Sequence, residues 1–157
     1  MTTLDLLNKK APAFKLTDQD GEIHNLKDYA GKLLVLYFYP KDLTPGCTIE
    51  ACNFRDNLAR VKSAGAAVLG VSADSVQRHA KFAAAMSLNF PVLSDESHEM
   101  LNTYGVWQEK RMMGKKYMGI VRTTLIIDEQ GTIRKIWTDV KVNGHVDEVI
   151  ATLKEIK

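Results

Sequence analysis

The chain has 157 residues, of which 45% are hydrophobic and 25% are charged, a composition typical of a globular domain with a sizeable core. Its formal net charge of +2, from 21 basic and 19 acidic residues, gives no reason to expect a nucleic-acid or anionic-membrane partner. We therefore expect a single domain over residues 1–157.

The sequence shows no signal for export or membrane insertion. No stretch approaches the ~20 apolar residues of a transmembrane helix, and residues 1–10 lack the basic start and apolar middle of a signal peptide. Two cysteines are too few for a secreted disulfide scaffold of this size. The expected location is the cytoplasm.

The first part of the chain predicts a hairpin, a buried strand and a helix. Residues 14–17 and 22–26 have the pattern of two strands, and an Asp-Gly pair marks the turn at 18–21. Residues 33–39 form a near-continuous apolar run, as expected of a strand covered on both faces. Residues 50–64 place apolar side chains at helical spacing.

The rest of the chain alternates in the same way. The predicted elements are a strand at 67–72, a helix at 75–87, a short strand at 90–93, a short helix at 97–104, a hairpin at 123–137 and a helix at 146–156. This order predicts an α/β fold, a thioredoxin-like sandwich with a mixed central sheet flanked by helices.

The two cysteines, Cys47 and Cys52, follow the first long apolar strand. Free cysteines are often small buried hydrophobic residues, and for Cys52 alone that interpretation is favoured. Cys47 differs, because Thr44 suits a helix N-cap and Pro45 the first helical position. Cys47 then lies in the first turn, where unpaired N–H groups and the helix dipole favour negative charge.

The helix terminus alone does not make a thiol reactive enough. A free thiol has a pKa near ~8.5, and lowering it to ~6 requires roughly 3.4 kcal/mol. A helix terminus supplies at most ~2 kcal/mol. A nearby arginine is the simplest further contribution, and since Arg55 is the only arginine close in sequence, we expect a distant one.

A permanent disulfide between Cys47 and Cys52 is disfavoured. It would close a very short loop and add little stability. On an ideal helix the two Cα atoms would lie about 8.6 Å apart, whereas a disulfide requires ~4.4–6.8 Å. We therefore hypothesise a redox switch, in which the helix is intact when reduced and its first turns unwind on oxidation.

The motif Pro40-x-x-x-Thr44-x-x-Cys47 resembles the signature of the peroxiredoxins. Its continuation through residue 56 resembles the bacterioferritin-comigratory (PrxQ, atypical 2-Cys) subgroup, whose resolving cysteine lies five positions further on. The resemblance covers residues 11–156 and includes four further segments, at 90–95, 104–107, 114–124 and 141–145.

The resemblance implies a role for each matching residue. Cys47 would be the peroxidatic nucleophile and Cys52 the resolving thiol. Thr44 would hydrogen-bond the peroxide, Arg122 would be the distant guanidinium, and Pro40 would shield the sulfur.

The resemblance also implies a thioredoxin-like fold with the peroxiredoxin N-terminal hairpin, and no metal or bound cofactor. It implies thiol-dependent reduction of hydrogen peroxide and organic hydroperoxides, with recycling by thioredoxin or a similar dithiol donor. Members of this subgroup are often monomers.

Several residues keep a second interpretation. Thr44 can act simply as a helix cap, and without the resemblance Arg122 would be a surface arginine before a strand. Glu50 either supports an arginine or occupies a solvated helix position. The basic segment Lys110–Lys116 is expected to be a solvated loop, although it could also steer an acidic reductase.

Two other functions remain as alternatives to a peroxidase. A thioredoxin-type disulfide oxidoreductase would carry Cys-x-x-Cys, whereas four residues separate Cys47 from Cys52. A non-enzymatic thiol protein, either a peroxide sensor or a holdase chaperone, would show no sustained peroxide turnover.

Overall fold

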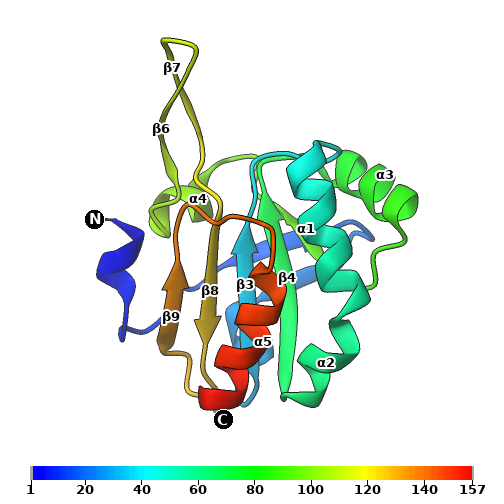
Figure 1. Ribbon diagram of the computed structural model, residues 1–157, viewed down its shortest axis with the longest axis vertical. Coiled ribbons are helices and arrows are strands. Elements are labelled where there is room, and N and C mark those ends of the chain that lie inside the picture. The colour runs from blue at the N-terminus through cyan, green and yellow to red at the C-terminus, as the bar shows by residue number, and fades with distance from the viewer. Residues whose placement is uncertain (1, 157) are drawn as a thin grey trace.

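The computed structural model describes residues 2–156 and contains a seven-stranded mixed sheet with helices on both faces (Figure 1). The spatial order of the strands is β2-β1-β5-β4-β3-β8-β9. Central β3 pairs parallel with β4 and antiparallel with β8, so the predicted mixed sheet is confirmed. The strands are β1 Lys15–Asp18, β2 Ile23–Asn25, β3 Leu33–Phe38, β4 Ala66–Ser72, β5 Val92–Ser94, β8 Thr123–Ile127 and β9 Ile133–Trp137.

The core lies on both faces of β3, whose six residues are all buried. Leu33, Val35 and Tyr37 pack in a cluster with side chains from α1, α2, α3 and α5. The alternate residues pack on the other face with α4 and the N-terminal segment. The helices are η1 Thr3–Leu6, η2 Leu26–Tyr29, α1 Pro45–Asp56, α2 Leu58–Ser63, α3 Val76–Met86, α4 Glu99–Thr103 and α5 His145–Ile156.

The single helix predicted at 50–64 is wrong in one respect. The helical segment begins at Pro45, as the order Thr44, Pro45 predicts, but it is interrupted at Asn57, which lies between α1 and α2 with φ −111° and ψ 11°. The Asn57 side chain donates a hydrogen bond to the Asn53 carbonyl, at 2.8 Å. Such local side-chain bonds compete with the helical ladder and explain the interruption.

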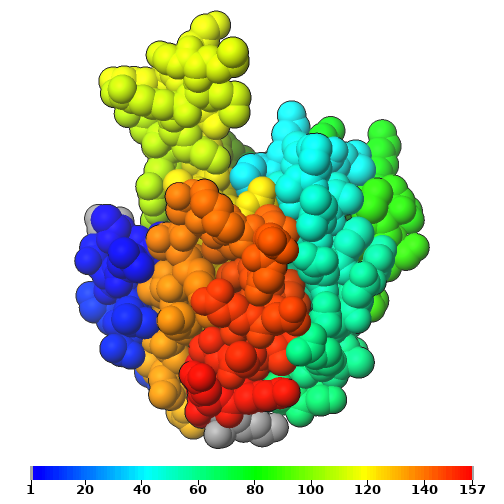
Figure 2. All heavy atoms as spheres, in the orientation of Figure 1, coloured from blue at the N-terminus to red at the C-terminus, as the bar shows by residue number. Residues whose placement is uncertain are grey.

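The solvated loop predicted at Lys110–Lys116 is instead a β-hairpin, formed by β6 Trp107–Met112 and β7 Lys115–Ile120. Its turn residues Met113 and Gly114 both have positive φ, 53° and 80°, as a two-residue primed turn requires. The hairpin projects from the body of the protein (Figures 1 and 2). Because most of its residues are exposed, the sequence there shows no apolar alternation.

The remaining predicted elements are present within a few residues of their expected bounds. For example, Ser75 caps α3 as expected, because its hydroxyl accepts a hydrogen bond from the Arg78 N–H. Within residues 2–156, no helix has the length and apolar character needed to cross a membrane.

Candidate active site

The loop that follows β3 places Cys47 in the first turn of α1, as predicted. Thr44 is the N-cap residue and Pro45 begins the helix, while Pro40, partly buried, opens the loop. The expected side-chain cap is wrong, because the Thr44 hydroxyl donates to the Lys41 carbonyl at 2.8 Å. The Thr44 side chain therefore accepts no hydrogen bond from the N–H groups that a first helical turn leaves unpaired.

Arg122, which directly precedes β8, lies between Cys47 and Glu50. Its Nη2 is 3.4 Å from the Cys47 Sγ, and its Nη1 is 2.7 Å from the Glu50 Oε1. The Cys47 and Glu50 side chains are buried, and that of Arg122 is 17% exposed. The interpretation of Arg122 as a surface arginine is therefore wrong, and the distant guanidinium that the thiol required is in contact with it.

Glu50 is not the solvated helix residue that the sequence allowed. It lies three positions after Cys47, a spacing that puts both side chains on one face of the helix. Burial raises the pKa of Glu50 to about 7, although the charge of Arg122 acts in the opposite direction. The second carboxyl oxygen has no hydrogen-bond partner among the described residues, which agrees with a carboxyl that readily binds a proton.

Two features keep Arg122 charged and close to the thiol. Burial by itself would lower the pKa of Arg122, but the charges of Glu50 and Cys47, together with the hydrogen bonds to both groups, raise that pKa. A Cβ atom at Gly46 would lie 3.1 Å from the Arg122 Nη2, so a larger residue at this position would crowd the guanidinium. The glycine directly before Cys47 thus has a steric reason.

Cys52 lies on α1 but faces a different neighbour. Its Sγ is 3.9 Å from the Met86 Sδ at the end of α3, and the residue is partly buried. Both cysteines are free thiols in this structure. Five positions along an α-helix turn a side chain by roughly 140°, so the two sulfurs point to different sides of α1.

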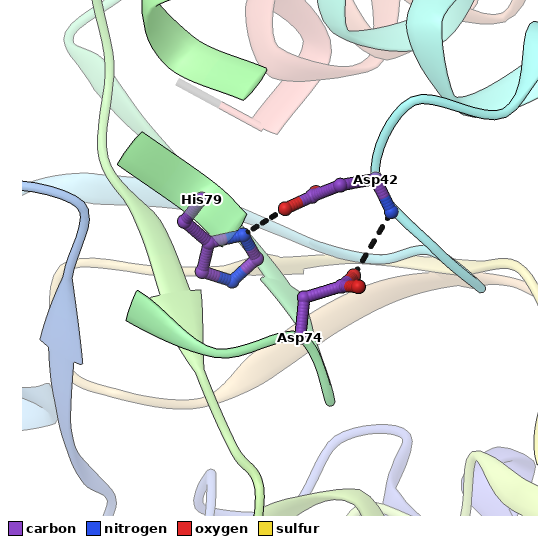
Figure 3. Close-up of side chains that lie close together, drawn as sticks. All are labelled: Asp42, Asp74 and His79. Atoms are coloured by element: carbon purple, nitrogen blue, oxygen red, sulfur yellow. Dashed lines mark hydrogen bonds and ion pairs between the residues drawn. The ribbon is translucent and has the colours of Figure 1, made fainter. Parts of the chain in front are cut away.

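Asp42 fixes the loop in front of α1 through a buried network that sequence reasoning missed (Figure 3). Its carboxylate accepts a hydrogen bond from the Tyr39 hydroxyl at 2.6 Å and lies 2.5 Å from the His79 Nδ1. His79 is completely buried, and its Nε2 donates to the Leu93 carbonyl. Asp42 and His79 are 37 positions apart, and no local spacing relates them.

The backbone of Asp42 is held as firmly as its side chain. Its N–H donates to the Asp74 carboxylate at 2.9 Å, and its carbonyl accepts from Arg78 at 3.1 Å. The next residue, Leu43, has φ +64°, a left-handed conformation that is strained for a leucine. The loop therefore enters α1 from a fixed point through a strained residue.

Among the described residues, Asp42, Asp74 and His79 form a group that could hold a metal ion. One ligand-type atom from each lies within 4.8 Å of the others. Both nitrogens of His79 and both carboxyl oxygens of Asp42 have hydrogen-bond partners within the protein. The hydrogen bonds of this cluster hold the loop in front of α1.

We predict a pH effect of Glu50 on stability. The folded protein retains a proton on Glu50 from about pH 4.5, the ordinary pKa, up to about pH 7. The stability linked to this proton is complete below that window and is lost as the pH rises through it. Glu50→Gln should remove this loss. The free energy of unfolding of the variant, relative to that of the unmodified protein, should therefore rise by roughly 2–3 kcal/mol between pH 4.5 and pH 8.

Urea unfolding of both reduced proteins at several pH values measures this difference. Stability curves that run parallel across the window would show that Glu50 does not carry the raised pKa.

Comparison with known proteins places the chain in a family. The model of the AhpC/TSA family matches residues 7–136. A putative peroxiredoxin Bcp of Coxiella burnetii is 50% identical over 147 residues, which cover 94% of this chain and 97% of that protein. Peroxiredoxin Bcp of Escherichia coli K12 is 48% identical, over 92% of this chain and 93% of its own length.

Solved structures agree with these relatives. The bacterioferritin comigratory protein of Xanthomonas campestris is 42% identical and has a TM-score of 0.86, with 90% of each chain covered. A mutant of PrxQ from Xylella fastidiosa is 38% identical, with a TM-score of 0.87 over 96% of this chain and 91% of that one. With its thioredoxin-like fold, the chain therefore belongs to the AhpC/TSA family and, within it, to the peroxiredoxins of the bacterioferritin-comigratory group.

Proposed function

We propose that this protein is a thiol-dependent peroxidase that reduces hydrogen peroxide and organic hydroperoxides, with Cys47 as the nucleophile. The observation that carries the proposal is the Arg122 guanidinium, held by Glu50 and in contact with the Cys47 sulfur. Family membership supports it, as does the similarity to the Xanthomonas protein, which is described for alkyl peroxide reduction.

In the first step the Cys47 thiolate attacks one peroxide oxygen. An S–O bond forms, the O–O bond breaks, and the leaving oxygen takes up a proton and departs as water or alcohol. Arg122 and the first-turn N–H groups stabilise the charge that moves onto this oxygen. The Thr44 hydroxyl donates its hydrogen bond to the Lys41 carbonyl. Toward the peroxide it therefore acts as a hydrogen-bond acceptor.

In the second step the Cys52 thiol condenses with the Cys47 sulfenic acid. A disulfide forms and water is released. The sulfurs cannot meet on an intact α1, because they point roughly 140° apart and their Cα atoms are about 8.6 Å apart on an ideal helix. The first turns of α1 must therefore unwind between the two chemical steps.

In the third step an external dithiol returns two electrons. Its thiolate attacks the Cys47–Cys52 disulfide to form a mixed disulfide, and its second thiol releases the reduced protein. We propose thioredoxin or a similar dithiol protein as this donor, and a monomer as the active unit.

The roles of the two cysteines are tested by replacing each with serine. Cys47→Ser should abolish peroxide turnover. Cys52→Ser should consume one equivalent of peroxide at the unmodified rate and then stop, because the sulfenic acid has no internal partner. Stopped-flow peroxide consumption, with mass spectrometry of the products, measures both. Sustained thioredoxin-dependent turnover of Cys52→Ser at the rate of the unmodified protein would refute the pairing.

The unwinding of α1 predicts a redox-dependent change in amide exchange. In the disulfide form, the amides of residues 46–54 should exchange at least ~10-fold faster than in the reduced form, since their helical hydrogen bonds are lost. The amides of α5, which makes no such transition, provide the internal control. Equal protection of residues 46–54 in both forms would rule out the switch.

A further inference from the structure

The large exposed hydrophobic side chains of this protein gather at one end of the molecule. Nine are found among the described residues, and six of them lie on the β6–β7 hairpin or around the start of α1, at that end. Four belong to the β6–β7 hairpin, one to the loop directly before α1 and one to α1: Met112, Met113, Tyr117 and Met118, then Leu43, then Ile49. An apolar patch of this kind on an exposed surface is typical of a binding site.

The hairpin and α1 form the two sides of an open notch. In Figure 2 the yellow-green hairpin stands apart from the cyan beginning of α1, and yellow atoms of the segment after β7 lie between them. That segment contains Arg122, two residues beyond the end of β7. The floor of the notch is thus formed next to the residue that contacts the Cys47 sulfur.

The hairpin also concentrates positive charge. Residues 107–120 contain four basic residues and one acidic residue, a formal charge of +3, whereas the whole chain carries +2. The Lys110 ammonium group donates a hydrogen bond to the Ile120 carbonyl at 2.9 Å. Arg111, Lys115 and Lys116 are exposed and make no ion pair within the part of the chain that the structure describes.

The size of this surface fits a protein better than a small molecule. Six-residue strands extend about 20 Å, and Met113 at the tip is 96% exposed. A cavity of about 800 Å³ lies elsewhere and is lined by residues such as Phe14, Leu34 and Met100. Methionine-rich surfaces adapt readily to a partner, which suits a contact that must form and dissociate in every cycle.

We propose that the β6–β7 hairpin and the beginning of α1 form the docking surface for the dithiol protein that reduces the Cys47–Cys52 disulfide. This proposal rests on the proposed function, since that function requires a protein dithiol to reach the Cys47–Cys52 disulfide on α1. The partner presents an apolar patch beside its thiols, with acidic side chains that face the hairpin cations. Charge complementarity of this kind mainly accelerates association.

Thioredoxin, kept reduced by its reductase, is the probe for this surface. Reversal of the three free cations, by Arg111→Glu, Lys115→Glu and Lys116→Glu together, should raise the KM for thioredoxin at least ~10-fold at low ionic strength. The control carries Lys32→Glu, Lys62→Glu and Lys154→Glu, three exposed lysines at the opposite end of the sheet. The control should change the KM less than ~2-fold.

Turnover with dithiothreitol separates the docking surface from the chemistry. Both triple variants should keep the unmodified rate with this small dithiol, which also shows that they are folded. An unchanged thioredoxin KM in the hairpin variant overturns the proposal, and so does binding of anionic phospholipid vesicles through the hairpin without any effect on that KM. Failure of the unmodified protein to turn over peroxide with dithiothreitol would contradict the proposed function instead.

Discussion

The proposed chemistry of this protein depends on one partly buried guanidinium, that of Arg122, held between the Cys47 thiol and the Glu50 carboxyl. The sheet explains how residues 75 positions apart meet. β3 and β8 are antiparallel neighbours, and Phe38 at the end of β3 pairs with Thr123 at the start of β8. The residue before β8 therefore lies beside the point where the chain leaves β3 and turns into α1.

α1 has well-defined boundaries that suit a segment able to unwind. Before it, Asp42 is fixed by hydrogen bonds through its backbone and its carboxylate. After it, Asn57 interrupts the helical path before α2. Leu43, between Asp42 and the start of α1, has a left-handed backbone that is strained for a leucine. Unwinding can thus stay local while the sheet remains intact.

Much of this arrangement could be predicted from the sequence. The apolar run of β3 and the order Thr44, Pro45, Cys47 gave the strand, the helix start and the position of the thiol, and the energy required for a thiolate called for a remote arginine. The buried partners were harder to find. Glu50 had a usable signal in its three-residue spacing from Cys47, whereas the Asp42–His79 contact depends on tertiary packing alone. The β6–β7 hairpin was not predicted because exposed strands show no alternation of apolar and polar residues.

The most direct test of this account is the rate at which Cys47 is oxidised when the guanidinium is removed. Arg122→Gln should slow the single-turnover reaction with hydrogen peroxide by about 10²–10³-fold, because a preorganised charge at the reacting oxygen is lost. The control is Arg134→Gln, which removes a 44% exposed arginine paired with Asp128 and should leave the rate unchanged. Oxidation of Arg122→Gln at the rate of the control would contradict the central role of Arg122.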